Sequence, residues 1–127
     1  MRGRTFRIIC AAAAFSLLAA IPALAGGDSA RRVGSCSGPG DWRLRVSRES
    51  ATRIRVRFDI EHVDPGESWQ LFLSDDGIGI FARTKIADAQ GELRAVKVTS
   101  DRAGTDHIKA SGVNVTAGGS CDGTIKY

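Results

Sequence analysis

Residues 42–60 read WRLRVSRESATRIRVRFDI, and this stretch decides the fold. Apolar side chains recur at every second position in two runs, which are Trp42, Leu44 and Val46, then Ile54, Val56, Phe58 and Ile60. A period of two is typical of β-strands that bury one face. The two runs are therefore expected to form neighbouring strands that pair through a turn at residues 48–51.

Turn signals and further short apolar segments continue this pattern toward the C-terminus. Asp64-Pro65-Gly66-Glu67 has Pro at the second and Gly at the third turn position, and Asp76-Gly77 suits a tight hairpin. Both turns are expected to connect antiparallel neighbours. Further strands are expected at residues 69–74, 78–83, 92–99, 108–115 and 121–127, separated by loops rich in Gly, Asp and Ala.

About seven short strands without a helical pattern after residue 25 indicate an all-β fold. We expect an antiparallel β-sandwich of the immunoglobulin-like type, and a small barrel is the alternative. About one hundred residues suffice for one core and leave no room for a second domain.

Residues 1–25 have the order of charged, apolar and small residues that is typical of a cleavable secretory signal peptide. Three arginines precede an apolar stretch that ends at Ala23-Leu24-Ala25. An uncleaved anchor is the alternative, because the stretch is nearly long enough to span a bilayer. Pro22 and the following Gly26-Gly27 favour cleavage.

Cleavage implies a secreted, extracellular protein with no membrane attachment. Residues 26–35 are small and charged, so we expect a flexible lead-in there, followed by one domain at residues 36–127. The full chain has 18 basic and 14 acidic residues, but the leader holds three arginines and no acid, which leaves 15 basic residues and a net charge of +1. Overall charge therefore gives no reason to expect specific nucleic-acid binding.

Only Cys36 and Cys121 lie beyond the leader, whose own cysteine is Cys10. In an oxidising compartment two such cysteines predict one disulfide. The bridge would join the start of the domain to its last strand. No free thiol would then be left for catalysis or for binding a metal.

Several short motifs resemble small secreted actinobacterial proteins that have a one-disulfide β-sandwich layout. The motifs are Cys36-Ser37-Gly38, Trp42-Arg43-Leu44, Trp69, residues 103–110 (AGTDHIKA) and the late Cys121. The segment around Gly104-Thr105-Asp106 is also similar to the penultimate strand of bacterial immunoglobulin-like domains. Those domains serve mostly as adhesion or spacer modules. Both resemblances imply fold and export rather than an activity, and Gly118-Gly119-Ser120 stands where such proteins often have an acid before the last cysteine.

The first two strands are rich in arginine. Five arginines alternate with the buried positions and are expected on one solvated face, namely Arg43, Arg45, Arg53, Arg55 and Arg57, whereas Arg48 lies outside this alternation. Like charges that face each other across a sheet are unfavourable. A partner with phosphate, sulfate or carboxylate groups would relieve the repulsion through bidentate contacts. These five arginines are the predicted ligand site, and the alternative is a charged face that prevents aggregation.

The acids and histidines show no recognisable metal-binding pattern. Asp75-Asp76 and the 101–106 loop offer the oxygen ligands that Ca²⁺ needs, but without EF-hand or repeat spacing, so turn-forming roles are expected. His62 and His107 lie far apart and lack further zinc ligands. We therefore predict no metal and no cofactor.

The aromatic residues are expected in the core. Trp42 has the parity of a buried residue and is predicted to pack against the disulfide. Exposed aromatics in a plane would make a carbohydrate platform, and Trp69, Phe81 and Tyr127 are the candidates for one. We favour core packing for them.

Together these patterns favour a secreted, monomeric, non-enzymatic binding or structural module. Its expected partner is an anionic cell-envelope polymer or an extracellular protein, bound through the arginine-rich face. The alternative is a secreted hydrolase or hydrolase inhibitor, although the sequence has no nucleophile elbow, paired-carboxylate motif or phosphate loop. A pure spacer is a third reading.

Overall fold

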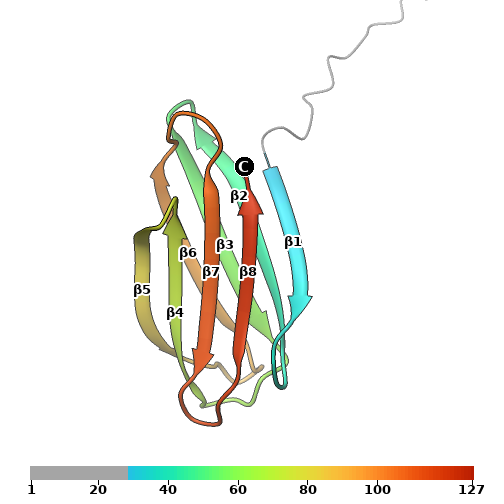
Figure 1. Ribbon diagram of the computed structural model, residues 1–127. Coiled ribbons are helices and arrows are strands. Elements are labelled where there is room, and N and C mark those ends of the chain that lie inside the picture. Colours follow the sequence, from blue (N-terminus) through green and yellow to red (C-terminus); the bar gives the residue numbers. More distant parts are fainter. Residues whose placement is uncertain (1–28) are drawn as a thin grey trace, which may run out of the picture.

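The computed structural model describes residues 29–127, which form two packed four-stranded antiparallel sheets (Figure 1). The strands are β1 (Ser29–Ser35), β2 (Asp41–Ser50), β3 (Arg53–Glu61), β4 (Ser68–Asp75), β5 (Ile78–Ile86), β6 (Leu93–Ser100), β7 (His107–Asn114) and β8 (Ser120–Lys126). One sheet has the order β1-β2-β3-β6 and the other β5-β4-β7-β8. The predicted antiparallel β-sandwich is confirmed, and the predicted signal peptide lies outside the described residues.

The alternating apolar residues form one core between the sheets. Leu44, Val46, Ile54 and Phe58 on the first sheet are fully buried, as are Leu71 and Ile108 on the second. The intervening residues of β2 face solvent, because successive side chains of a strand point to opposite faces. The prediction that the two apolar runs in residues 42–60 form strands with one buried face is therefore confirmed. The alternation also determines which face of the first sheet presents the arginines.

The expectation of a flexible lead-in at residues 26–35 is wrong for residues 29–35, which form strand β1. This strand pairs antiparallel with β2 from Ser29 opposite Ser47 to Ser35 opposite Asp41. Its inward positions hold Ala30, Arg32 and Gly34, so it gives no run of alternating large apolar residues. It nevertheless satisfies the hydrogen-bonding edge of β2 and brings the number of strands to eight.

The two predicted turns have different roles. Asp76 and Gly77 both have positive φ and close the β4–β5 hairpin, as expected of a tight two-residue turn. Gly66 also has a positive φ, and Glu67 N donates to Asp64 O, so the second turn exists too. It leads from β3 in one sheet to β4 in the other, however, so the expectation that it joins antiparallel neighbours is wrong.

The topology without β1 is a variant of the immunoglobulin arrangement. The seven remaining strands place β2, β3 and β6 in one sheet and β5, β4, β7 and β8 in the other. In constant-type immunoglobulin domains the fourth strand lies beside the fifth. Here the fourth of the seven, β5, lies beside β4 at an edge of the second sheet.

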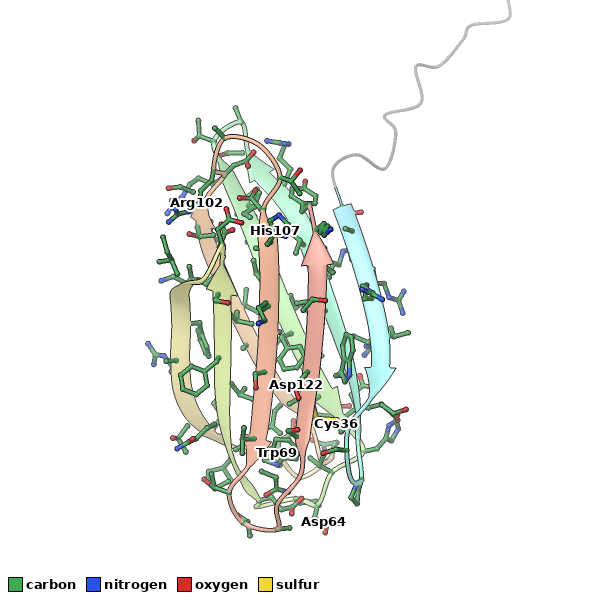
Figure 2. All side chains as sticks on the ribbon, viewed as in Figure 1. Cys36, Asp64, Trp69, Arg102, His107 and Asp122 are labelled. Carbon is green, nitrogen blue, oxygen red and sulfur yellow. A yellow bond between two sulfur atoms is a disulfide. The ribbon has the colours of Figure 1, made fainter. Side chains whose placement is uncertain are left out.

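The predicted disulfide links Cys36, directly after β1, to Cys121 in β8. It therefore ties the edge of one sheet to the edge of the other (Figure 2). Trp42 is buried nearby, and its indole lies against Gly34 of β1 and Gly123 of β8, where an added Cβ would meet the ring at 2.5 and 2.6 Å. Within residues 29–127 no helix is long and apolar enough to cross a membrane.

Candidate functional site

Three arginines lie directly opposite one another on the outer face of the first sheet. Arg31 of β1 faces Arg45 of β2, and Arg45 faces Arg57 of β3. Neighbouring strands are about 4.8 Å apart, so the three side chains leave the sheet within about 10 Å. We call these residues the arginine row. It concentrates positive charge in the middle of the face.

A hollow of about 150 Å³ lies over the arginine row and is lined by Arg31, Arg43, Arg45, Arg57 and Asp59. A water molecule occupies about 30 Å³ in the liquid. The hollow thus has room for one phosphate, sulfate or carboxylate group with a few waters. Because four of its five lining residues are cationic, its chemistry favours an anion.

The structure brings together three of the five predicted arginines. Arg43, Arg45 and Arg57 line the hollow, whereas Arg53 and Arg55 do not. Arg55 lies one row further along β3 and donates two hydrogen bonds of 2.9 Å to Glu49, while Arg53 lies at the first position of β3, opposite Ser50. The hydrogen bonds from Arg55 lower the pKa of the Glu49 carboxyl. The cationic centre is therefore smaller than the predicted set.

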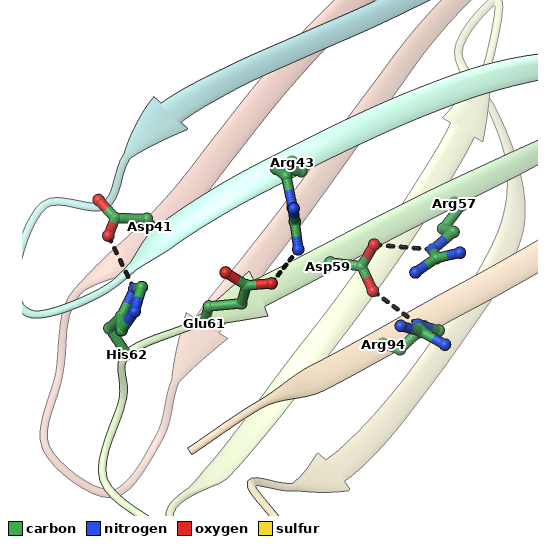
Figure 3. A network of polar contacts seen from close by, with 7 residues as sticks. All are labelled: Asp41, Arg43, Arg57, Asp59, Glu61, His62 and Arg94. Carbon is green, nitrogen blue, oxygen red and sulfur yellow. Dashed lines mark hydrogen bonds and ion pairs between the residues drawn. The ribbon is translucent and has the colours of Figure 1, made fainter. Parts of the chain in front are cut away.

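Carboxylates on the same face hold several of its arginines in place (Figure 3). Asp59, only 8% exposed, accepts a 2.8 Å hydrogen bond from Arg57 Nε and a 2.6 Å hydrogen bond from Arg94 Nε. Arg43 donates to Glu61 on the neighbouring strand. Asp59 is thus a partly buried anchor that fixes the Arg57 guanidinium at the rim of the hollow.

Arg31 and Arg45 have no such anchor. Among the described residues no carboxylate lies within ion-pair distance of either guanidinium. Both side chains are exposed. Arg45 has an arginine directly opposite on each neighbouring strand and Arg43 two positions away on its own strand, so its charge is the least compensated of the row.

The acids of this face collect on the other side of Asp59. A second hollow, of about 220 Å³, is lined by Asp59, Ile60, Glu61, Asp88, Glu92, Leu93 and Arg94. The acids of this face therefore gather at the end where β3 ends and β6 begins, and the arginine row lies further along the strands. An extended anion would be attracted to the arginine row and repelled from that end.

Arg31 is the member of the site that sequence reasoning missed. Its strand, residues 29–35, was expected to be a flexible segment because it lacks apolar alternation. The only signal was the basic pair Arg31-Arg32 shortly before the first clear strand. Arg32 has the other parity and reaches across to β8, where its Nη1 donates to Thr124 O at 3.3 Å.

The opposite sheet brings three aspartates together at one end of the sandwich, the end that Arg102 and His107 mark in Figure 2. Oxygens of Asp75, Asp76 and Asp106 all lie within 4.8 Å of one another. Asp76 follows the expected turn chemistry, since it has a positive φ in the β4–β5 turn, and its Oδ1 also accepts a 2.9 Å hydrogen bond from His107 N. Asp75 and Asp106 are each only 1% exposed, which turn chemistry does not explain.

Burial raises the pKa of both hidden carboxyls. The pKa of Asp106 rises to about 6, first because of burial and then because of the nearby carboxylates of Asp101 and Asp75. Burial, followed by the charge of Asp76, also raises the pKa of Asp75. The sequence does contain a parity signal for this burial. Asp75 continues the inward series of Trp69, Leu71 and Leu73, and Asp106 has the same parity as the inward residues Ile108 and Ala110.

The raised pKa of Asp106 predicts a pH dependence of stability. The folded chain binds this proton more tightly than the unfolded chain, so the contribution is complete below the ordinary pKa of 3.8 and is lost as the pH rises through about 6. In buffer with a chelator, the unfolding free energy of the wild type minus that of Asp106→Asn should fall by about 1–3 kcal/mol between pH 4 and pH 7.

Urea unfolding at pH 4, 5.5 and 7 measures this difference, because the amide cannot titrate. Asp64→Asn, an exposed position at the other end of the sandwich, is the matched control and should show no such change. A difference that stays constant with pH would contradict the raised pKa.

The remaining candidates have simpler surroundings. His62 is exposed with Nδ1 3.0 Å from Asp41, and His107 is exposed at the start of β7. Trp69 is only 1% exposed, so it cannot serve in a carbohydrate platform. Phe81 and Tyr127 pack partly against the core.

No family model matches the chain, and no curated protein matches it. One similar solved chain is described as "Crystal structure of Br derivative BhCBM56". The two chains are 11% identical, the similarity covers 74% of this chain and 98% of the other, and the TM-score is 0.38. A similarity of this degree says nothing about what this chain binds.

Proposed function

We propose that this protein is a secreted, non-enzymatic binding module that holds an anionic polymer at the arginine row. The single observation that carries the proposal is the position of Arg45. Its guanidinium lies between Arg31 and Arg57 and has no carboxylate partner among the described residues. Three directly opposed arginines repel one another, and a bound anion would turn this repulsion into attraction.

The ligand class follows from the size and shape of the site. The hollow of about 150 Å³ suits one anionic group, so affinity for a polymer would come from repeated engagement along the chain. The fork of a guanidinium matches phosphate, sulfate and carboxylate oxygens. The acids beside Asp59 would keep such a polymer away from the end of the face where β3 ends. An anionic cell-envelope polymer meets these conditions.

The disulfide supports a location outside the cytoplasm. Such bridges persist in oxidising compartments and are rare where thiols are kept reduced. An envelope polymer would be accessible to a protein at that location. We propose that the protein acts there as a monomer.

Replacing both unanchored arginines, Arg31→Ser with Arg45→Ser, is expected to weaken binding of an isolated anionic envelope polymer, or of polyphosphate as a defined probe, by at least about tenfold. Each lost charge-assisted contact is worth about 1.5–3 kcal/mol. The slope of log K against log salt should become shallower by about one for each arginine removed. Calorimetric titration over a range of salt concentrations measures both effects.

The control is Arg83→Ser with Lys109→Ser, which removes the same charge from exposed positions of the second sheet. Neither double variant breaks an ion pair of the described residues, and the control loses only the exposed contact of Arg83 with the Phe81 ring, so both should retain the thermal unfolding temperature of the wild type. Equal weakening by both variants would show that only net charge matters. No binding by the wild type would make the arginine row a solubility device.

A further inference from the structure

The strongest unexplained feature outside the arginine row is a pair of buried carboxylates without hydrogen-bond donors. Asp75 ends β4 and Asp106 directly precedes β7, and each is only 1% exposed. None of their four carboxylate oxygens has a partner of hydrogen-bond geometry among the described residues, although the backbone of Arg102 and the carboxyl of Asp101 lie near Asp106. Burying a carboxylate without a compensating partner is costly, so such groups are normally paired or coordinate a metal.

Asp76 completes the cluster and opens it to solvent. It is exposed in the β4–β5 turn, and one of its oxygens lies with those of Asp75 and Asp106 inside 4.8 Å. Its Oδ1 accepts a hydrogen bond from His107 N, which leaves Oδ2 available. The three acids thus offer five oxygens without a hydrogen-bond donor among the described residues. Four of them are the buried oxygens of Asp75 and Asp106, and the fifth is Oδ2 of Asp76.

Backbone hydrogen bonds hold the three acids on adjacent strand ends. Asp76 N donates to His107 O at 3.0 Å, and Asp106 exchanges two backbone hydrogen bonds with Tyr127, at 2.8 and 2.9 Å. Asp75 pairs with Ile108 in the ladder between β4 and β7. The cluster is therefore built on the rigid ends of β4, β7 and β8 rather than on a free loop.

The other charged groups at this end come from the 101–106 loop. Asp101 lies close enough to Asp106 to interact with its carboxyl and is paired with Arg48 Nη1 at 3.2 Å. Arg102 Nε is 3.9 Å from Asp75 Oδ2, beyond hydrogen-bond distance, and its side chain is 44% exposed. One distant, solvent-facing guanidinium does not balance three clustered acids.

We infer that Asp75, Asp76 and Asp106 bind a hard divalent cation of the Ca²⁺ type. Carboxylate oxygens without any histidine or cysteine suit Ca²⁺ or Mg²⁺ rather than zinc or copper. Ca²⁺ accepts six to eight oxygens in irregular geometry, so five carboxylate oxygens and a few waters satisfy it. Mg²⁺ demands a stricter octahedron and keeps several waters, which two buried carboxylates leave little room for.

A cation at this point would tie the β4–β5 turn to the start of β7 and to the 101–106 loop. Its role is structural, and it lies on the sheet opposite the arginine row, so it is independent of the proposed polymer binding. Extracellular Ca²⁺ modules bind with dissociation constants of about 0.1–1 mM. An affinity in this range would keep the site loaded outside the cell and empty in a cytoplasm.

The first test is a titration of the purified chain with CaCl₂ at constant ionic strength. Calorimetry measures binding, and thermal unfolding measures the gain in stability. We expect one Ca²⁺ per chain and a rise in unfolding temperature of about 5–10 °C at 10 mM CaCl₂. MgCl₂ should give a smaller rise. If CaCl₂ up to 10 mM gives no heat of binding and no shift in unfolding temperature, the inference is overturned.

Variants locate the site. Asp76→Asn keeps the carbonyl that accepts from His107 N, so it should fold normally yet weaken Ca²⁺ binding at least about tenfold, as each lost charged ligand lowers affinity. Asp106→Asn should abolish the Ca²⁺ response, and Asp64→Asn should preserve it. A full response in Asp76→Asn and Asp106→Asn would place the ion elsewhere and overturn the inference.

The competing explanation is a proton shared between Asp75 and Asp106. In that case Asp106→Asn would raise the unfolding temperature equally with CaCl₂ and with chelator, and the wild type would not respond to Ca²⁺. If Ca²⁺ binds, the wild type should gain stability from CaCl₂ that the variant does not. The two explanations therefore differ in whether CaCl₂ stabilises the wild type relative to Asp106→Asn.

Discussion

A chain in which Cys36 and Cys121 are both replaced by alanine is expected to lose about 2–5 kcal/mol of unfolding free energy. The bridge closes a loop with a sequence separation of 85 residues, for which the chain-entropy model gives about 4–5 kcal/mol. Domains of this size are stable by only about 5–15 kcal/mol. Loss of the bridge therefore removes a large share of the total stability.

Urea unfolding of the double variant, and of the wild type with and without dithiothreitol, measures this loss. Alanine is preferred to serine because Cys121 is fully buried and a hydroxyl there would need a partner. Reduction should destabilise the wild type by about as much as the substitution and should leave the variant unchanged. The same unfolding midpoint for the oxidised and reduced wild type would contradict the prediction.

The core of the first sheet could be predicted from the sequence because its signal is local. The two runs at residues 42–46 and 54–60 alternate strictly, and a shift of one residue would turn every apolar side chain to solvent. The same alternation correctly placed Arg43, Arg45 and Arg57 on the outer face. The single disulfide followed from counting, since only two cysteines lie beyond the leader.

Features that depend on pairing between distant segments could not be predicted in this way. Strand β1 is held by hydrogen bonds to β2 and by the space that Gly34 leaves for Trp42, and neither contribution appears as apolar alternation. The turn at Asp64–Glu67 was recognised, but the residues around it do not reveal that it crosses between sheets. Arg31 was missed for the same reason as its strand.

The aspartate cluster shows how a local rule can hide a tertiary feature. Asp75-Asp76 and Asp106 were assigned to turns because aspartate is common there, and Asp76 does follow that rule. The register of β4 and β7 then places Asp75 opposite Ile108 and so brings Asp106 beside it. The two buried acids are 31 positions apart in the sequence, so only their inward parity could have indicated a shared site.

Replacing Trp42 with alanine is expected to cost about 3–5 kcal/mol, which is the usual cost of truncating a buried tryptophan. The indole packs beside Phe58, with 6.3 Å between ring centroids, and fills the space over Gly34 and Gly123. Because β1 has Ala30, Arg32 and Gly34 on its inner side and no large apolar residue, Trp42 is its main large apolar neighbour. Urea unfolding measures the cost.

A double-mutant cycle with Gly123→Ala tests whether the Trp42 ring fills the space over Gly123. In the wild type the new Cβ would lie 2.6 Å from the Trp42 ring, and such overpacking costs about 1–3 kcal/mol. In the Trp42→Ala background the ring is gone, so Gly123→Ala should cost much less, giving a coupling of about 1 kcal/mol or more. Gly79→Ala is the control, because its Cβ would meet open space.

The same variant links the core to the arginine row. If Trp42 holds β1 against β2, Trp42→Ala should speed hydrogen exchange of the β1 amides more than that of β4 or β7. Arg31 would then lose its fixed position, and polymer binding should weaken although no arginine has changed. Unaltered β1 exchange together with unaltered binding would mean that backbone pairing with β2 alone positions Arg31.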